Sequence, residues 1–140
     1  MSNKIKTVYV SGGIAGLKVE EVFSYFESME DKLLKLGLDV LSPVRGKVLD
    51  NEVASLYEPN EIVHRDENDI KSSDLMIAFP SGKSIGTFME IYLARKICDI
   101  PVIVVTTNPH IANHYWVRAY ASKIVSSLDE AIDYLQSWYL

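Results

Sequence analysis

The stretch DLMIAFPSGKSIGTFME, residues 74–90, indicates the fold of this chain. Leu75–Phe79 is an apolar run without polar alternation, which is typical of a strand that is covered on both faces. Pro80 ends the strand, and the apolar spacing from Ser84 to Cys98 predicts a helix. A buried strand that leads within a few residues into a helix is the unit from which parallel α/β sheets are built.

The same alternation of strands and helices continues on both sides of this unit. Further strands are predicted at residues 5–10, 38–41, 100–105 and 123–125, and further helices at residues 19–36, 59–72 and 127–138. We therefore predict a single α/β domain over residues 1–140. Its five-stranded parallel sheet has helices on both faces, as in flavodoxin-like and Rossmann-like folds. Ligands of such sheets bind beyond the carboxyl ends of the strands.

Local signals add detail to this prediction. Gly37 is a good C-terminal cap for the first helix, and the pattern from Ser127 to Glu130 is a capping box that opens the last one. Residues 43–58 read as a long polar loop, whereas residues 106–120 fit no element clearly. The last helix is expected to turn four apolar residues toward the core: Ala131, Ile132, Leu135 and Trp138.

Composition and charge argue against several kinds of partner. The net charge of −5 disfavours a nucleic-acid polymer or an anionic membrane, because both are bound by clustered Lys and Arg. No run approaches the roughly eighteen apolar residues that a spanning helix needs. The single cysteine, Cys98, can form neither an internal disulfide nor a cysteine cage, and the histidines lack metal-ligand spacing. We expect a cytoplasmic protein that uses no metal and no cofactor.

Two glycine-rich turns follow predicted strands. In the first, Ser11, Gly12, Gly13 and Ile14 can bring the backbone close to a ligand, and the helix that follows favours an anion. The alternative is a merely tight turn, and the spacing is not the dinucleotide fingerprint. The second turn, residues 81–90, places Ser84 and Gly86 in a similar setting but lacks the P-loop pattern.

Glu90 has two interpretations of equal weight. Thr87-x-x-Glu90 is a capping-box pattern, so the carboxylate could accept a backbone amide of its own helix. Glu90 also lies near the ligand edge of the sheet with apolar neighbours, which favours a nucleophile or base. Asp66 alone reads as a solvated side chain, but it gains interest beside Glu90 because glycosyl chemistry commonly needs two carboxylates.

Together, these motifs resemble the nucleoside 2-deoxyribosyltransferase superfamily, which includes the deoxynucleoside 5′-monophosphate N-glycosidases. The resemblance rests on Tyr9–Gly12, on the acidic helix before Asp74, and on Gly86-Thr87-x-x-Glu90, in order over residues 5–105. It implies that Glu90 is the nucleophile that forms a covalent glycosyl-enzyme intermediate. It also implies that Asp66, eight positions before Asp74, assists the leaving base, and that Tyr9 hydrogen-bonds the nucleophile.

The resemblance further implies the ligand and the assembly. Ser84 stands where deoxyribosyltransferases usually carry an Asp, and the monophosphate N-glycosidases have a phosphate-contacting Ser there. Ala15, however, stands where those hydrolases place an Arg. A nucleoside and its 5′-monophosphate are thus both expected substrates, with the sugar passed to another base or to water. Asn113 is expected to complete the site of a neighbouring subunit, in a homodimer or larger homo-oligomer.

Two other functions stay open. The GTxxE element also occurs in the lysine-decarboxylase-like phosphoribohydrolases, but their PGGxGTxxE signature is incomplete because Pro80 and Gly86 are too far apart. A non-catalytic nucleotide-binding or sensing module would keep both glycine-rich turns without using Glu90 as a nucleophile.

Overall fold

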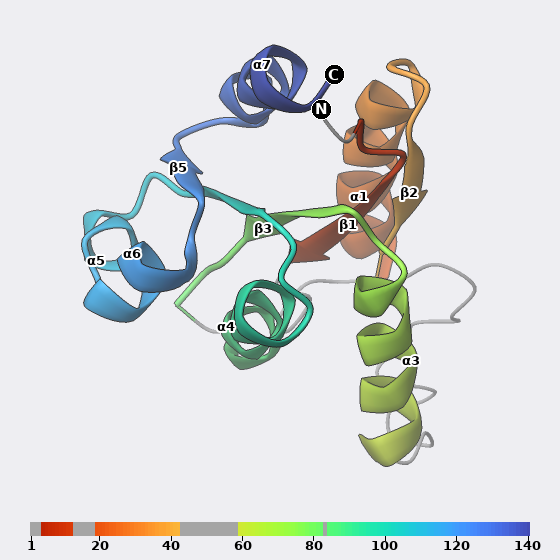
Figure 1. Cartoon of the computed structure of the whole chain (residues 1–140). Helices are drawn as coiled ribbons and strands as arrows, with labels where there is room; N and C mark the ends of the chain where they lie inside the picture. Colours follow the sequence, from red (N-terminus) through yellow and green to blue (C-terminus); the bar gives the residue numbers. More distant parts are fainter. Residues whose placement is uncertain (1–3, 13–18, 43–58, 83) are drawn as a thin grey trace.

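A five-stranded parallel sheet forms the centre of the computed structural model, which describes residues 4–12, 19–42, 59–82 and 84–140 (Figure 1). The strands are β1 (Thr7–Gly12), β2 (Asp39–Leu41), β3 (Leu75–Phe79), β4 (Val102–Val105) and β5 (Lys123–Val125). Their order is β2-β1-β3-β4-β5, and every neighbouring pair is parallel. This is the flavodoxin-like order, in which the strand order reverses between β1 and β3. The predicted α/β fold class is confirmed.

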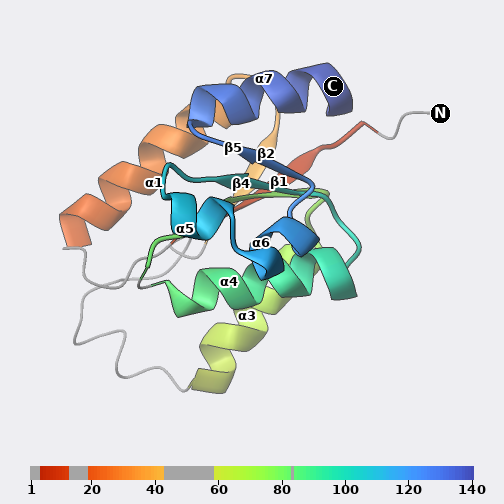
Figure 2. The same ribbon diagram turned by 90° about the vertical axis from the view of Figure 1, so that its left-hand side faces the viewer.

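Helices cover both faces of the sheet, as predicted. Within the described ranges they are α1 (Val19–Leu34), α3 (Pro59–Lys71), α4 (Ile85–Tyr92), α5 (Pro109–Ala112), α6 (Tyr115–Tyr120) and α7 (Leu128–Tyr139). Figure 2 shows α1 and α7 on one face of the sheet, with α3, α4, α5 and α6 toward the other. None of these helices is long and apolar enough to cross a bilayer.

The predicted helix over residues 84–98 is not α-helical throughout. It begins as α4 and continues without a break into a π-helical segment, η1 (Leu93–Ile97). The apolar spacing predicted the position and length of this helix but not its change of hydrogen-bonding pattern. A π turn differs from an α turn by one residue, and apolar periodicity over so short a segment does not distinguish the two.

Two apolar clusters pack on the two faces because successive strand residues point to opposite sides. On β1, Val8 and Val10 belong to the cluster under α1 and α7, whereas Tyr9 belongs to the cluster under α3 and α4. The first cluster includes Phe26, Met29, Leu33, Ala131 and Leu135, and the second includes Ile70, Ile91, Ala94, Ile111 and Val117. The alternation along β1 therefore decides which of its side chains can reach α4.

The predicted helix ends are confirmed at two positions. Gly37 follows α1 with a φ of 82°, a left-handed conformation that glycine adopts without the cost that a Cβ imposes. At the start of α7, the Ser127 hydroxyl accepts a hydrogen bond from the Glu130 amide at 3.1 Å. The Glu130 carboxylate in turn accepts from the amide and the hydroxyl of Ser126.

The expectation that Trp138 packs into the core is wrong. Ala131 and Leu135 are fully buried, but Trp138 on the last turn of α7 is 69% exposed. Its ring lies 6.0 Å from the ring of Tyr134 on the same helix. Helical periodicity identifies a face, but it does not show how far along a helix the core extends.

Residues 106–120, which fitted no element in sequence, contain the two short helices α5 and α6. The Asn108 side chain accepts a hydrogen bond from the His110 amide at 2.9 Å, which caps α5. His114 caps α6, because its Nδ1 accepts from the Trp116 amide at 3.2 Å. Helices of four and six residues show too few turns for an apolar period, so caps define them better than periodicity does.

Candidate active site

Tyr9 and Ser11 present two hydroxyl groups on one face of β1. They are two residues apart, so their side chains point to the same side of the sheet, toward α4. Both residues are fully buried. In the sheet, Ser11 pairs with Ala78 and Gly12 with Phe79, at the carboxyl ends of β1 and β3. Ligands bind at this edge in open parallel sheets, because strand order reverses here.

Glu90 meets both hydroxyls. Its Oε2 accepts a hydrogen bond from the Tyr9 hydroxyl at 3.0 Å, and its Oε1 accepts one from the Ser11 hydroxyl at 2.6 Å. The side chain is half-buried, and it projects from α4 between the buried residues Thr87 and Ile91. Each carboxylate oxygen therefore has its own donor from the same strand.

The capping interpretation of Glu90 is wrong. The N-cap of α4 is Ser84 and the helix begins at Ile85, so Thr87 lies within the first turn and is buried. The carboxylate of Glu90 is directed to β1 instead of to the start of its own helix. The capping-box spacing in the sequence is accidental, because the turn before α4 ends three residues earlier than that pattern requires.

Burial and charge keep Tyr9 in its protonated form. Burial is the largest cause that raises the pKa of Tyr9 well above its ordinary value of 10.0. The negative charges of Glu90 and Asp66 raise it further, and Asp69 contributes least. Tyr9 is thus a permanent hydrogen-bond donor, and the half-buried Asp66 of α3 lies near enough to act on it electrostatically.

Ser84 closes the turn before α4. This serine is buried. Its Oγ accepts a hydrogen bond from the Ser81 amide at 2.6 Å and donates one to the Ser81 carbonyl oxygen at 2.8 Å. The hydroxyl makes no capping bond to α4. Gly86 follows in the first turn of the helix, where a Cβ would meet no described atom within 4 Å. The described protein atoms therefore leave open space beside Gly86.

Asn113 lies between the short helices α5 and α6. It is the C-cap of α5 and is exposed, and its amide donates to the Pro109 carbonyl oxygen at 3.0 Å. Gly13 and Ile14, together with the loop at residues 43–58, lie outside the described residues. Of the predicted site residues, the structure thus brings Tyr9, Ser11 and Glu90 into direct contact.

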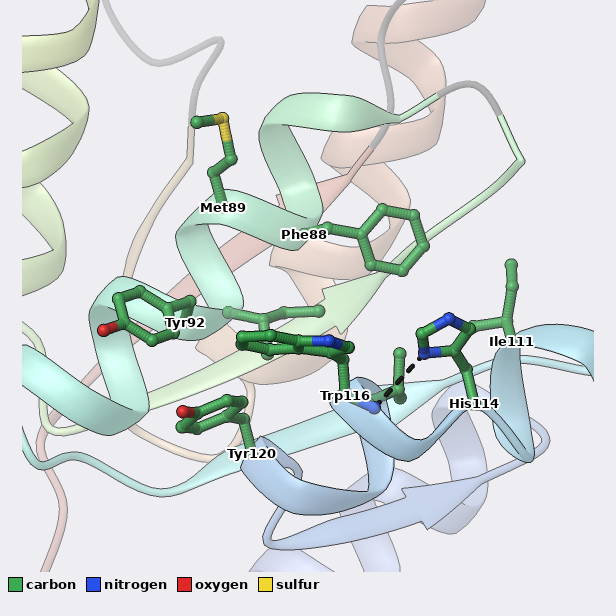
Figure 3. A pocket seen from close by; sticks show the side chains of 9 residues that line it. Phe88, Met89, Tyr92, Ile111, His114, Trp116 and Tyr120 are labelled. Carbon is green, nitrogen blue, oxygen red and sulfur yellow. Dashed lines mark hydrogen bonds between the residues drawn. The ribbon is translucent and has the colours of Figure 1, made fainter.

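An apolar pocket of about 530 Å³ lies on the other side of α4 (Figure 3). Its lining comes from α4, α5, α6 and the residue before α6: Phe88, Met89, Ile91, Tyr92, Ile111, His114, Trp116, Val117 and Tyr120. Met89 and Trp116 are 69% and 56% exposed. Glu90 does not line this pocket, because residues 88 and 90 project about 200° apart around a helix.

The exposed aromatic surface is what sequence reasoning missed. Tyr115 and Trp116 of α6 are 74% and 56% exposed, and only Tyr120 of the same helix is half-buried, with its ring 5.1 Å from that of Tyr92. A signal was present in residues 85–92, where five large apolar residues form a stripe about 160° wide around the helix: Ile85, Phe88, Met89, Ile91 and Tyr92. A stripe wider than the roughly 100° that faces a core indicates a second contact surface in addition to the sheet.

Comparison with known proteins locates this fold among solved structures. No family model matches the chain, and no curated protein matches it. A 2-deoxyribosyltransferase from Bacillus psychrosaccharolyticus superimposes with a TM-score of 0.71 at 17% identity, covering 89% of each chain. The chain shares the fold of a 2-deoxyribosyltransferase.

Two further structures show what else this fold carries. A CMP N-glycosidase from Clostridium botulinum has a TM-score of 0.62 at 22% identity, over 95% of this chain and 99% of that one. A Moco carrier protein from Chlamydomonas reinhardtii has a TM-score of 0.64 at 19% identity, over 95% and 96%. At these identities the likeness establishes the fold, and the chemistry has to be argued from the site.

The site offers carboxylate chemistry. Across the described part of the chain, no group of three or more His, Cys, Asp or Glu side chains could hold a metal ion. What the structure does assemble is one carboxylate with two hydroxyl donors, and a second carboxylate, Asp66, near the same tyrosine. Such a pair suits nucleophilic attack assisted by an acid.

Proposed function

We propose that this chain cleaves the N-glycosidic bond of a nucleoside or its 5′-monophosphate, with Glu90 as the nucleophile. The observation that carries the proposal is the pair of hydroxyls, Tyr9 and Ser11, on the two oxygens of the Glu90 carboxylate. A carboxylate held in one orientation at the ligand edge is suited to attack on a sugar carbon. The fold shared with a 2-deoxyribosyltransferase and a CMP N-glycosidase agrees with this chemistry.

The proposed reaction has two substitutions at the anomeric carbon C1′. One oxygen of Glu90 forms a bond to C1′ while the bond from C1′ to the base nitrogen breaks, and the bonding electrons leave with the base. Asp66 has to enter this step as the protonated acid, and it gives its proton to the departing nitrogen and becomes a carboxylate. Water or a second base then attacks C1′, the Glu90 carboxylate leaves, and Asp66 recovers the proton of the incoming group. Two inversions give net retention at C1′.

The 5′ end of the substrate is proposed to lie at the start of α4. Ser84 and Gly86 occupy this turn, and the described residues leave room for a ligand beside Gly86, since none of their atoms lies within 4 Å of a Cβ placed there. The first amides of a helix have no partner within it and favour an anion, which suits a 5′-phosphate. In this structure the Ser84 hydroxyl donates a hydrogen bond to the Ser81 carbonyl oxygen. To donate to a phosphate, the hydroxyl has to break that hydrogen bond first.

The test is chromatography of ribo- and deoxynucleosides and their 5′-monophosphates after incubation with the protein, with and without an acceptor base. Glu90→Gln removes the nucleophile and keeps the shape of the side chain. We expect it to slow base release by more than about 10³-fold while ligand binding stays measurable. The matched control is Asp133→Asn, an exposed carboxylate of α7 on the other face of the sheet, with unchanged activity.

The outcomes of this assay separate the candidate functions. Free base without acceptor indicates a hydrolase, and base exchange that needs an acceptor indicates a transferase. If the parent protein binds nucleotides but releases base from none of them, the proposal is wrong and a sensing module is the better interpretation. Base release by Glu90→Gln at the parental rate would also contradict it.

We also propose that the chain assembles as a homodimer or larger homo-oligomer through the surface formed by α4 and α6. Several large apolar side chains of this surface are exposed, among them Met89 and Trp116, and exposed apolar patches of this kind commonly mark protein interfaces. Asn113 is exposed beside the same surface, which suits the expected contribution to a neighbouring subunit's site.

A further inference from the structure

We infer that Ser11 is a positioning residue for Glu90, whose hydroxyl fixes the orientation and the ionised state of the carboxylate instead of contacting substrate. This inference deepens the proposed function and rests on it for its catalytic meaning. Its structural basis is the 2.6 Å hydrogen bond from the Ser11 hydroxyl to Oε1 of Glu90, between a fully buried residue and a half-buried one.

The hydroxyl of Ser11 has no second proton to offer a ligand. A serine hydroxyl carries one proton, and in this structure that proton points to Oε1 of Glu90. The residue is also fully buried, so it presents no exposed surface to a substrate in this structure. The predicted role of Ser11 in substrate binding is therefore replaced by a role that acts through Glu90.

Two donors restrict the carboxylate more than one donor does. The terminal torsion of a glutamate joins an sp³ to an sp² carbon and is broad, so one hydrogen bond leaves the carboxylate plane free to swing. Tyr9 holds Oε2 and Ser11 holds Oε1, which fixes the plane at two points. Both donors come from β1, whose alternation places them on one face.

The short bond also favours the charged carboxylate over the protonated acid. A hydroxyl that donates to an ionised oxygen makes a shorter and stronger hydrogen bond than a neutral pair does. Among the residues that the structure describes, the titratable groups that interact at this corner besides Glu90 are Tyr9 of β1, and Asp66 and Asp69 of α3, whose charges act on Tyr9. Those acids disfavour a further negative charge, so the hydroxyl of Ser11 offsets them at Glu90.

The experiment compares Ser11→Ala with the parent protein by carbon-13 NMR titration of the glutamate carboxyls, with the Glu90 signal assigned from Glu90→Gln. Loss of a hydrogen bond to a charged group is expected to raise the pKa of Glu90 by about one to two units. In turnover, the acid limb of the pH profile should move up by the same amount, and kcat should fall more than KM changes.

The chain offers a matched control in Ser42. Its hydroxyl donates to Oε1 of Glu30 at 2.9 Å, and the residue is buried like Ser11 and directly follows β2. Ser42→Ala removes an equivalent bond elsewhere, so it should leave the titration of Glu90 and the turnover unchanged. Thermal unfolding of both variants checks that each one folds. Ser11→Thr retains the hydroxyl and should restore the parental pKa of Glu90.

The titration does not depend on turnover, so the two proposals can fail separately. If Glu90 titrates alike in the parent and in folded Ser11→Ala, the positioning role is wrong whatever the activity. If the pKa of Glu90 moves as expected but the parent releases base from no nucleoside or nucleotide, the proposed function is wrong and the positioning of Glu90 stands.

Discussion

Tyr9 places a phenol in the interior of the sheet's second apolar cluster, with its hydroxyl on a carboxylate. The ring contributes buried apolar surface, and the hydroxyl contributes a donor that cannot ionise in the ordinary range, because burial raises the pKa of Tyr9 well above 10.0. One residue therefore serves both the packing of the core and the orientation of Glu90.

We expect Tyr9→Phe to keep the fold and to slow base release by about 10- to 100-fold, the cost of one hydrogen bond to a charged group. A second readout follows from proton linkage. The folded state holds the phenolic proton more tightly than the unfolded chain does. The stability from neutral Tyr9 is therefore fully present below pH 10.0 and is lost as the pH rises above it.

Urea unfolding from about pH 9 to about pH 11 measures this linkage. The parent protein should lose more stability over that range than Tyr9→Phe, since the other tyrosines and the lysines titrate in both proteins. Parallel losses in the two proteins would show that Tyr9 does not carry the raised pKa.

At the level of single residues, the sequence predicted which residues lie at the site better than it predicted the contacts between them. The two-residue spacing of Tyr9 and Ser11 on a strand already implies a shared face. Both hydroxyls reach Glu90 only because the turn through Ser84 places α4 close to β1. No local sequence pattern encodes the distance between that helix and that strand. Ser11 was predicted as a ligand contact, and its hydrogen bond to the Glu90 carboxylate was not predicted.

The helices show which of their features near neighbours in sequence determine and which depend on the rest of the fold. The capping box at Ser127 predicted the start of α7 correctly, because a cap is a contact between near neighbours in sequence. The π-helical segment η1 and the exposure of Trp138 were not predictable in the same way. Both depend on what the rest of the molecule places against the helix.

Removing the cap of α7 should destabilise the protein measurably. We expect Ser127→Ala to lower the free energy of unfolding by about 1 kcal/mol, as measured in urea. The control is Ser137→Ala, an exposed serine of the same helix that makes no cap and should change stability little. An equal loss in the two variants would contradict the capping role.

Glu130 adds a pH dependence to this element. The hydrogen bond from the Ser126 amide, and next the one from its hydroxyl, lower the pKa of Glu130 below its ordinary value of 4.5. A carboxyl group whose pKa is lowered by folding stabilises the fold at pH values above its pKa in the unfolded chain. That contribution is lost as the pH falls through its pKa in the folded protein. The stability difference between the parent and Glu130→Gln should therefore shrink below about pH 4.5.

On the scale of the whole molecule, the sequence predicted the class of sheet but not its order. Apolar runs without alternation indicated parallel strands, whereas the arrangement β2-β1-β3-β4-β5 is a property of the folded chain. The surface over α4 and α6 is likewise a whole-molecule feature. It combines side chains from α4, α5 and α6, so the apolar stripe of residues 85–92 indicates only part of it.

This surface makes a prediction about assembly. We expect light scattering after size-exclusion chromatography to show a species larger than the 15.8 kDa monomer, and Trp116→Glu to shift it toward the monomer. The matched control is Trp138→Glu, which charges an equally prominent tryptophan on α7, at the other face of the sheet. A monomeric parent protein, or an equal effect of both changes, would refute the proposed interface.

The contact between Tyr9 and Glu90 has a consequence for biosynthesis, because it joins residues 81 positions apart. The strand that carries both hydroxyls is translated well before the helix that carries the carboxylate. Parallel pairing of β1 with β3 has to close a long stretch of chain before the three groups can meet, and such closure is slow compared with local helix formation. A nascent chain that stops before α4 therefore carries two donors without this acceptor, and the three groups can meet only after β3 and α4 have both been made.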